Sequence, residues 1–181
     1  QARRGAGTFV KERPRLRRMT RAWYREHRGG SPFRAEMEAQ GLHSRRDWQS
    51  ETVQAPVAIR ERLGLDEPDD GLPDVMRTVY VFYAEHEPKM LSTSWEPYAL
   101  TKGTPIAFPE DGPYADFGVV ERMHVIGVEI SHASEIGSAR PASVDEARLL
   151  QLPVGALALA IERTYYEDAR AVETADILIP V

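Results

Sequence analysis

The sequence has no cysteine and no long apolar run among its 181 residues. The absence of cysteine excludes a disulfide framework, thiolate zinc sites and cysteine nucleophiles, and it fits a reducing compartment. A membrane-spanning helix needs about 18 consecutive apolar residues, and no run approaches that length. The N-terminus also lacks the basic, apolar and small-residue order of a secretory signal. We therefore expect a cytoplasmic protein that makes no membrane contact.

Familiar signatures of catalytic and cofactor sites are missing as well. The sequence contains no Gly-rich phosphate loop, no Gly-x-Ser-x-Gly turn and no His-Glu-x-x-His pair. The histidines lack the spacing that metal ligation on a helix requires, since they are scattered over His27, His43, His86, His124 and His132. These absences predict no catalytic residue, no metal site and no cofactor.

What the sequence does contain is an ordinary globular composition with an uneven charge. Hydrophobic residues make up 42% and charged residues 28%, which is typical of a chain that can bury a core. Residues 1–46 hold 13 of the 23 Lys and Arg and 4 of the 28 Asp and Glu, a net charge of +9, which leaves −14 on residues 47–181. The basic segment can contact a phosphate backbone or form a solvated helix face, and charge alone does not separate the two.

Helix and strand signals alternate along the chain. Ser31 and Pro32 are typical of a helix start, and Gly64 is typical of a helix end. In order, the predicted elements are a basic helix over 12–28, a helix from Ser31 to Gly41, a strand near Trp48, a helix over 56–64, strands over 75–83 and 90–95, a loop over 105–113, a strand over 119–132 with a bulge at Gly127, a capped helix from Ser143, and strands over 156–166 and 171–179.

The strand pairs within 75–95 and 156–179 are related by an internal repeat. Arg77-Thr78 in the first pair recurs as Arg163-Thr164 in the second, and each pair follows a helix. The order helix, strand, turn, strand thus occurs twice, which predicts an α+β domain with an antiparallel sheet, flanking helices and internal pseudo-symmetry. The repeat also predicts that Arg77 and Arg163 occupy equivalent points, with a ligand cleft where the two halves meet.

Together these features resemble a transcription regulator of the GntR superfamily, HutC branch, and its effector-binding UTRA domain. The stretch GAGTFV at 5–10 resembles the end of a winged-helix wing, and the predicted helices over 31–42 and 56–65 and both hairpins continue the match. The final hairpin resembles the family's through Glu162–Tyr166 and Val172-Glu173. The resemblance implies a wing remnant over 1–10, a basic linker helix over 11–30 and an effector-binding domain over 31–181.

The resemblance also implies a chorismate-lyase-like fold and a homodimer. A small-molecule effector would change the spacing of two DNA-binding heads, and operator DNA would be bound through an N-terminal winged helix that is absent from this chain. In sugar-phosphate-sensing members, backbone amides at the start of the helix after the linker hold the phosphate, and the matching positions are Phe33, Arg34 and Ala35. The unpaired amides of a first helical turn do favour an anion, although Ser31 can equally serve only to cap them.

Other ligand-binding positions carry over from the same members. Two arginines precede the first hairpin turn there, whereas this sequence has Tyr80 and Phe82, a departure that argues against a phosphosugar. Ser92 replaces an acidic residue, Ser94 shares its strand face, and Glu173 matches the family's acidic residue on the last hairpin. We expect an effector with a polar or anionic group at the Phe33 helix start and an apolar body against Tyr80 and Phe82.

Several of these side chains have an equally simple structural interpretation. Ser92 and Ser94 can be ordinary strand residues, and Glu173 can be a surface charge or the ion-pair partner of Arg163. Arg77 and Arg163 can brace the sheet or clamp an acid. Aromatic residues in strands often belong to the core, and this alternative applies to Trp95, Tyr98, Tyr165 and Tyr166, which can also line the pocket.

The leading hypothesis from the sequence is therefore a ligand-sensing, dimerising part of a bacterial regulator, and not an enzyme. One alternative is an enzyme of the chorismate-lyase type acting on a small carboxylate, with Arg77 or Arg163 and Glu173 closing over its substrate. Another alternative makes residues 1–46 an independent binder of nucleic acid, which salt-dependent affinity for duplex DNA would reveal.

Overall fold

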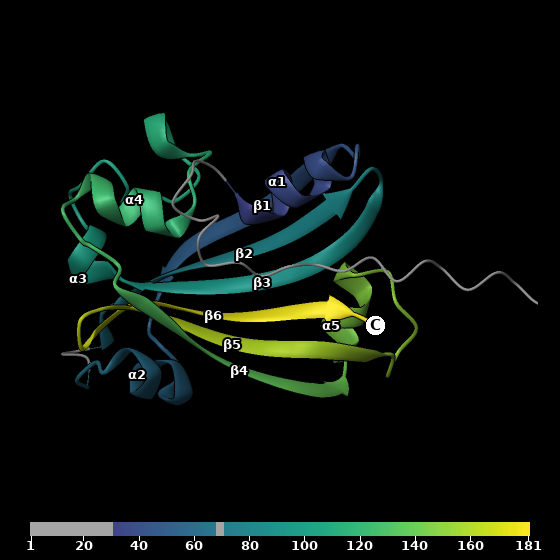
Figure 1. Ribbon diagram of the computed structural model, residues 1–181. Helices are drawn as coiled ribbons and strands as arrows, with labels where there is room; N and C mark the ends of the chain where they lie inside the picture. The colour runs from purple at the N-terminus through teal and green to yellow at the C-terminus, as the bar shows by residue number, and fades with distance from the viewer. Residues whose placement is uncertain (1–30, 68–70) are drawn as a thin grey trace, which may run out of the picture.

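Residues 31–67 and 71–181, which the computed structural model describes, form one six-stranded antiparallel sheet with helices against it (Figure 1). The elements are α1 (Pro32–Ala39), β1 (Ser44–Val53), α2 (Val57–Leu63), β2 (Val75–Ala84), β3 (Glu87–Pro97), α3 (Tyr98–Thr101), η3 (Gly112–Tyr114), α4 (Val119–Val125), β4 (His132–Pro141), α5 (Val144–Leu149), β5 (Leu157–Glu167) and β6 (Arg170–Pro180). The expected α+β architecture is confirmed. The predicted wing remnant over 1–10 and the linker helix over 11–30 lie outside the described residues.

The strand order β1-β2-β3-β6-β5-β4 reflects the internal repeat. Each half runs strand, helix, hairpin: β1, α2, β2 and β3 in the first, and β4, α5, β5 and β6 in the second. The halves meet where β3 pairs with β6, from Leu91 opposite Leu178 to Trp95 opposite Thr174. The predicted repeat is therefore present, and it includes one strand more per half than the sequence indicates.

Helices α1 and α4 cover one face of the sheet, called here the α1/α4 face. Phe33 and Met37 of α1 pack in one cluster with Ile161 of β5, and Met123 of α4 packs with Tyr165 of the same strand. Because alternate residues of a strand share a face, Ile161 and Tyr165 place both helices on the same side.

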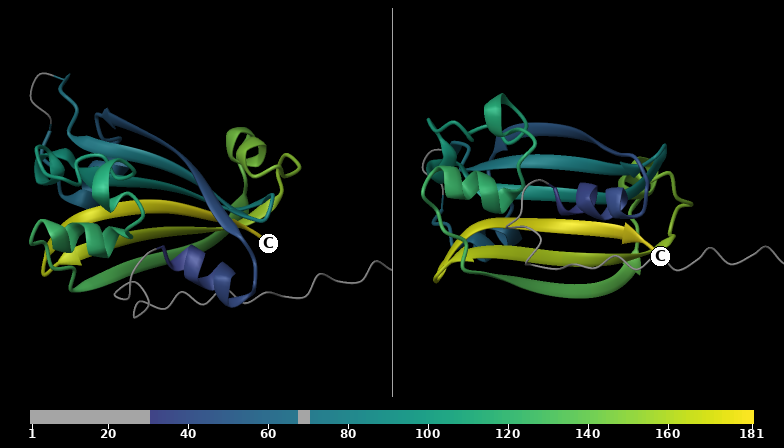
Figure 2. Two further views of the ribbon diagram at one scale, coloured as in Figure 1. Left: turned by 90° about the horizontal axis from the view of Figure 1, so that it is seen from above. Right: turned by 45° about the horizontal axis from the view of Figure 1, so that its top comes forward.

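Helices α2 and α5 cover the other side, called the α2/α5 face. Leu150, at the end of α5, packs in one cluster with Val81 of β2, and Leu63 of α2 packs with Val75 of the same strand. The neighbour of Val81, Phe82, belongs to the cluster of α1 instead, as alternation along a strand requires. The view from above in Figure 2 separates the blue α1 from the light green α5 across the sheet.

Most predicted helix boundaries are confirmed by local geometry. Ser31 is the N-cap of α1 with Pro32 in its first turn, and Gly64 ends α2 in the left-handed conformation with φ +63°. Ser143 and Glu146 form the expected capping box at the start of α5. Among the helices of the described residues, none combines the length and the apolar character that crossing a membrane requires.

The predicted strand over 119–132 is wrong. Residues 119–125 form α4, whose buried Val120 and Met123 lie three positions apart on one helix face, and Gly127 then turns the chain with φ +79°. The β-branched Val and Ile residues of this segment favour a strand by propensity, but packing of the helix against the sheet outweighs that preference.

The strand that follows, β4, has no counterpart in the prediction. It lies at the edge of the sheet and is exposed along nearly its whole length. A strand without a buried face shows no alternation of apolar and polar residues, so its sequence carries little signal. In contrast, the predicted hairpins over 75–95 and 156–179 are confirmed, with turns at Glu85-His86 and Asp168-Ala169.

Candidate functional site

Most of the ligand-binding residues predicted from the sequence meet on the α1/α4 face, around the junction of β3 and β6. Tyr80 lies directly opposite Ser92 across β2 and β3, and Ser94 lies opposite Ala175 across β3 and β6. Glu173 lies opposite Tyr165 across β6 and β5. The group contributed by these strands is Tyr80, Ser92, Ser94, Arg163, Tyr165 and Glu173.

The centre of this group is the carboxylate of Glu173, which is fully buried. The Ser94 hydroxyl donates a hydrogen bond of 2.7 Å to Oε1 of Glu173, and Nη2 of Arg163 lies 3.5 Å from the same oxygen. The Arg163 guanidinium also lies over the Tyr165 ring, 4.3 Å from its centroid. The interpretation of Glu173 as a surface charge is therefore wrong, while its predicted ion pair with Arg163 is present.

A row of aromatic rings connects Tyr80 of this group to the start of α1. The Tyr80 and Phe82 rings are stacked, with centroids 5.6 Å apart, and the Phe82 and Phe33 rings are tilted at 5.2 Å. Phe33 is buried, whereas Tyr80 and Phe82 are half-buried. The rings therefore bring the predicted anion-binding turn of α1 and the strand residues into one neighbourhood.

Helix α1 begins after Ser31 without a side-chain cap. The Ala35 amide donates to the Ser31 carbonyl at 3.1 Å, and the Ser31 side chain makes no capping hydrogen bond in this described helix. Arg34 is exposed and lies 3.8 Å from Glu38 on the next turn. The interpretation of Ser31 as a side-chain cap for these amides is thus not what the geometry shows.

Sequence reasoning missed a buried carboxylate beside Tyr80. Glu110, from the segment between α3 and η3, lies 2.6 Å from Nη2 of Arg46 on β1 and accepts a hydrogen bond from the Tyr80 hydroxyl. Burial raises the pKa of both Tyr80 and Glu110, and at Glu110 the hydrogen bond from Arg46 opposes that rise. Because Glu110 lies in a segment predicted only as a loop, no pattern in the sequence placed it here.

A second missed pair joins α4 to β3 on the same face. The guanidinium of Arg122 binds the carboxylate of Glu96 through two hydrogen bonds, one of them 3.4 Å long. Their side chains are 3% and 2% exposed. Burial is the largest single influence on the pKa of Arg122 and lowers it, but the charge and hydrogen bonds of Glu96, together with Tyr80 and Glu110 nearby, outweigh burial and the pKa is raised. The prediction of a strand over 119–132 missed this contact, because the Arg122 side chain reaches Glu96 from a helix.

Arg77 and Trp95 lie apart from this group, on the α2/α5 face. Nη1 of Arg77 is 2.5 Å from Oε1 of Glu51 in a largely exposed pair, and Trp95 packs in the cluster of α2. The predicted equivalence of Arg77 and Arg163 is therefore wrong, because the two side chains extend from opposite faces. The matching Arg-Thr dipeptides lie at different registers of their hairpins, and a shift of one residue reverses the face.

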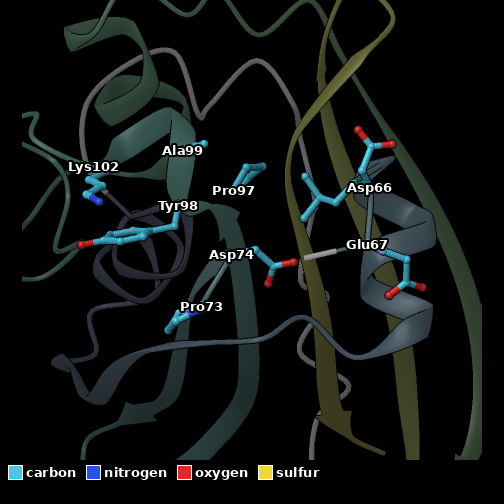
Figure 3. A pocket seen from close by; sticks show the side chains of 9 residues that line it. Asp66, Glu67, Pro73, Asp74, Pro97, Tyr98, Ala99 and Lys102 are labelled. Carbon is cyan, nitrogen blue, oxygen red and sulfur yellow. The ribbon is translucent and has the colours of Figure 1, made fainter. Parts of the chain in front are cut away.

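A cavity of about 330 Å³ lies away from the Glu173 carboxylate, between the end of α2 and α3. Figure 3 shows Tyr98 and Lys102 on one side of it and Asp66 and Glu67 on the other. Of the aromatic residues that the sequence suggested for a pocket, Tyr98 lines this cavity. Tyr166 does not line it and instead stacks on His132, with ring centroids 4.9 Å apart. Asp74, which lies between these two groups in Figure 3, is held by Arg60 at 2.6 Å, so its charge is already balanced.

Comparison with known proteins gives consistent matches. The family model described as the UTRA domain matches residues 39–180. The uncharacterized HTH-type transcriptional regulator SCO4628 of Streptomyces coelicolor is 32% identical over 168 residues, covering 89% of this chain and 61% of that regulator. The chain thus spans less than two thirds of that relative's length.

Solved structures agree with the family match. A crystal structure of a protein proposed to be a GntR-family transcriptional regulator has a TM-score of 0.83 and 42% identity, covering 97% of this chain and 70% of that one. The effector domain of PhnF from Mycobacterium smegmatis has a TM-score of 0.64 at 19% identity, covering 83% of this chain and 88% of that one. The second likeness is one of fold, and it confirms the α+β architecture expected above.

Proposed function

Because this chain belongs to the UTRA domain family and is related to GntR-type transcriptional regulators, we propose that it is the effector-sensing part of a HutC-type regulator. A small molecule bound on the α1/α4 face would alter operator binding by the whole protein. The observation that carries the proposal is the group around Glu173, where Ser94 and Arg163 converge from β3 and β5 on one buried carboxylate.

In this proposal, the aromatic row links the site to α1, and through α1 to an N-terminal DNA-binding part. Phe33 of α1 packs on Phe82, so a ligand against Tyr80 and Phe82 has different contacts when α1 shifts. A ligand changes a conformational equilibrium only through such a difference in affinity. Since residues 1–30 precede α1 in the sequence, the position of α1 would affect how an N-terminal winged helix is held.

The remaining features of the proposal concern partners and location. We expect a homodimer, operator DNA bound through the winged helix, and a cytoplasmic protein. The relatives described above are assigned to transcriptional regulators by their names, which supports a sensor more than an enzyme of the chorismate-lyase type. Turnover of chorismate, followed by the absorbance of its product, would contradict this choice.

A thermal-shift screen tests the sensor proposal, because a ligand that binds only the folded state raises the melting temperature. Sugars, sugar phosphates, amino acids and aromatic acids form the panel. We expect one class to give a saturable shift, and Glu173→Ala to weaken that ligand while the oligomeric state stays the same.

Glu51→Ala is the matched control, since Glu51 pairs with Arg77 on the α2/α5 face and should leave the affinity unchanged. Equal loss of affinity in both variants, or unchanged affinity in calorimetry for Glu173→Ala, would remove Glu173 from the site.

A further inference from the structure

We propose that the effector is an uncharged, hydroxyl-bearing molecule, such as a sugar or polyol, and that the site rejects phosphorylated and carboxylic ligands. This inference rests on the function proposed above and goes beyond it by naming the ligand class. It is carried by the balance of charge on the α1/α4 face and by the hydroxyl groups and rings next to it.

Arginines that extend onto this face of the described residues each have a carboxylate partner. Arg163 lies 3.5 Å from Glu173, and Arg46 lies 2.6 Å from Glu110. The third pair joins Arg122 and Glu96. Glu135 adds a further negative charge, because it lies directly opposite Arg163 across β4 and β5. The side chains of this face therefore carry no excess of positive charge that could neutralise an anion.

Because these ion pairs are buried, the balance of their charges determines whether a charged ligand can bind. The side chains of Glu173, Glu96 and Glu110 are 0%, 2% and 7% exposed, so charges here are screened little by water. An incoming phosphate would be a buried charge without a counterion unless it displaced Glu173 from Arg163 or Glu110 from Arg46. An incoming ammonium beside the three buried carboxylates faces the same difficulty, because each of them already has its arginine.

Groups suited to an uncharged ligand lie beside these pairs. The Ser92 hydroxyl can both donate and accept, and the Ser94 hydroxyl, whose proton is donated to Glu173, can still accept. The hydroxyl of Tyr80 lies next to Glu110. The stacked rings of Tyr80 and Phe82 provide an apolar surface for the C–H face of a sugar ring. Small-molecule sites are usually lined by apolar and aromatic side chains together with a few polar groups.

The test does not require the effector, because it asks whether the carboxylates exclude anions. Glu173→Gln and Glu110→Gln remove one negative charge each and preserve shape, and Glu51→Gln is the control because it frees Arg77 on the opposite, solvated face. Each protein is titrated with inorganic phosphate against sodium chloride of equal ionic strength, and binding is measured by calorimetry and thermal shift. Near-ultraviolet circular dichroism checks that each variant is folded.

We expect wild type and Glu51→Gln to show no saturable phosphate binding. At least one of the two site variants should bind phosphate with an affinity about tenfold or more above the weakest that the assay detects for wild type. That factor corresponds to about 1.4 kcal/mol of binding free energy. If both fold and neither gains affinity, charge balance does not control the site and the inference is wrong. Saturable binding of phosphate by wild type that Tyr80→Ala removes would also overturn the inference.

A second arm compares matched neutral and phosphorylated probes, glucose with glucose 6-phosphate and inositol with inositol 1-phosphate. Stronger stabilisation by a phosphorylated member would overturn the inference and leave the proposed sensor function standing. The sensor function fails on a different result, namely when no ligand class in the thermal-shift panel binds in a way that depends on Glu173.

Discussion

Replacing Arg122 with methionine should destabilise the protein strongly, because it leaves a carboxylate alone in the interior. Arg122 and Glu96 are 2% and 1% exposed, and the guanidinium on α4 holds the carboxylate on β3 through two hydrogen bonds. Methionine fills much of the space of the arginine stem. The lost charge, rather than a new cavity, therefore dominates the expected change in unfolding free energy.

The size of the effect follows from protonation, because the Glu96 carboxylate of the variant can avoid a buried unpaired charge only by binding a proton. Keeping a carboxylic acid with an ordinary pKa of about 4.3 protonated costs about 3.7 kcal/mol at pH 7 and about 1 kcal/mol at pH 5. The first figure agrees with the roughly 3–5 kcal/mol lost when one partner of a buried pair is removed. In the variant the folded state holds a proton that the unfolded state releases, so the loss should grow as pH rises, by about 1.4 kcal/mol per unit.

Urea unfolding of wild type and Arg122→Met at pH 5, 6 and 7 measures this difference. Arg148→Met is the exposed control, since Arg148 and Asp145 are 77% and 81% exposed, and it should change stability by less than about 0.5 kcal/mol. The double variant Arg122→Met/Glu96→Leu should return to within about 1 kcal/mol of wild type, because no charge is left unpaired. A loss below about 1 kcal/mol at pH 7, or one that does not change with pH, would refute the reasoning.

Two further predictions concern α2 and α5. The pKa of Glu146 is lowered from 4.5 to about 2, chiefly by its hydrogen bonds from Arg140, so this stabilisation is present above pH 4.5 and is lost as pH falls toward 2. Because Arg140 is 43% exposed, Glu146→Gln should cost only about 1 kcal/mol at pH 7, and urea unfolding should show the difference shrinking below pH 4.5. Gly64→Ala should cost about 1 kcal/mol in the same assay, because φ is +63° with open space around the position; a neutral result would mean that the end of α2 relaxes.

The sequence was sufficient for the elements whose signals are local. The capping box at Ser143 depends on residues three positions apart, and the end of α2 at Gly64 depends on one residue that tolerates positive φ. Both hairpins contain alternating β-branched and aromatic residues with a buried face. These features need no knowledge of the rest of the chain, and each was predicted at its observed place.

The parts that failed depend on tertiary contacts. Arg122 reaches Glu96 only because residues 119–125 are helical, and Glu110 reaches Arg46 across 64 positions from a loop. A buried ion pair of this kind has no periodic signature, since either residue alone is typical of an exposed surface. The candidate site was thus predicted from the resemblance at Tyr80, Ser94 and Glu173, while its charge balance became visible only in the fold.

The location of Glu173 explains why a site would form at this point of a duplicated fold. Ser94 belongs to the first half and Glu173 to the second, and their hydrogen bond joins residues 79 positions apart across the boundary of β3 and β6. A ligand that engages Ser94, Tyr80 and Glu173 therefore contacts both halves at once. Any shift of the halves along β3 and β6 changes all of those contacts together, so the affinity of such a ligand reports the relative position of the halves. A site confined to one hairpin would lack this property, because the contacts within a hairpin move as one unit.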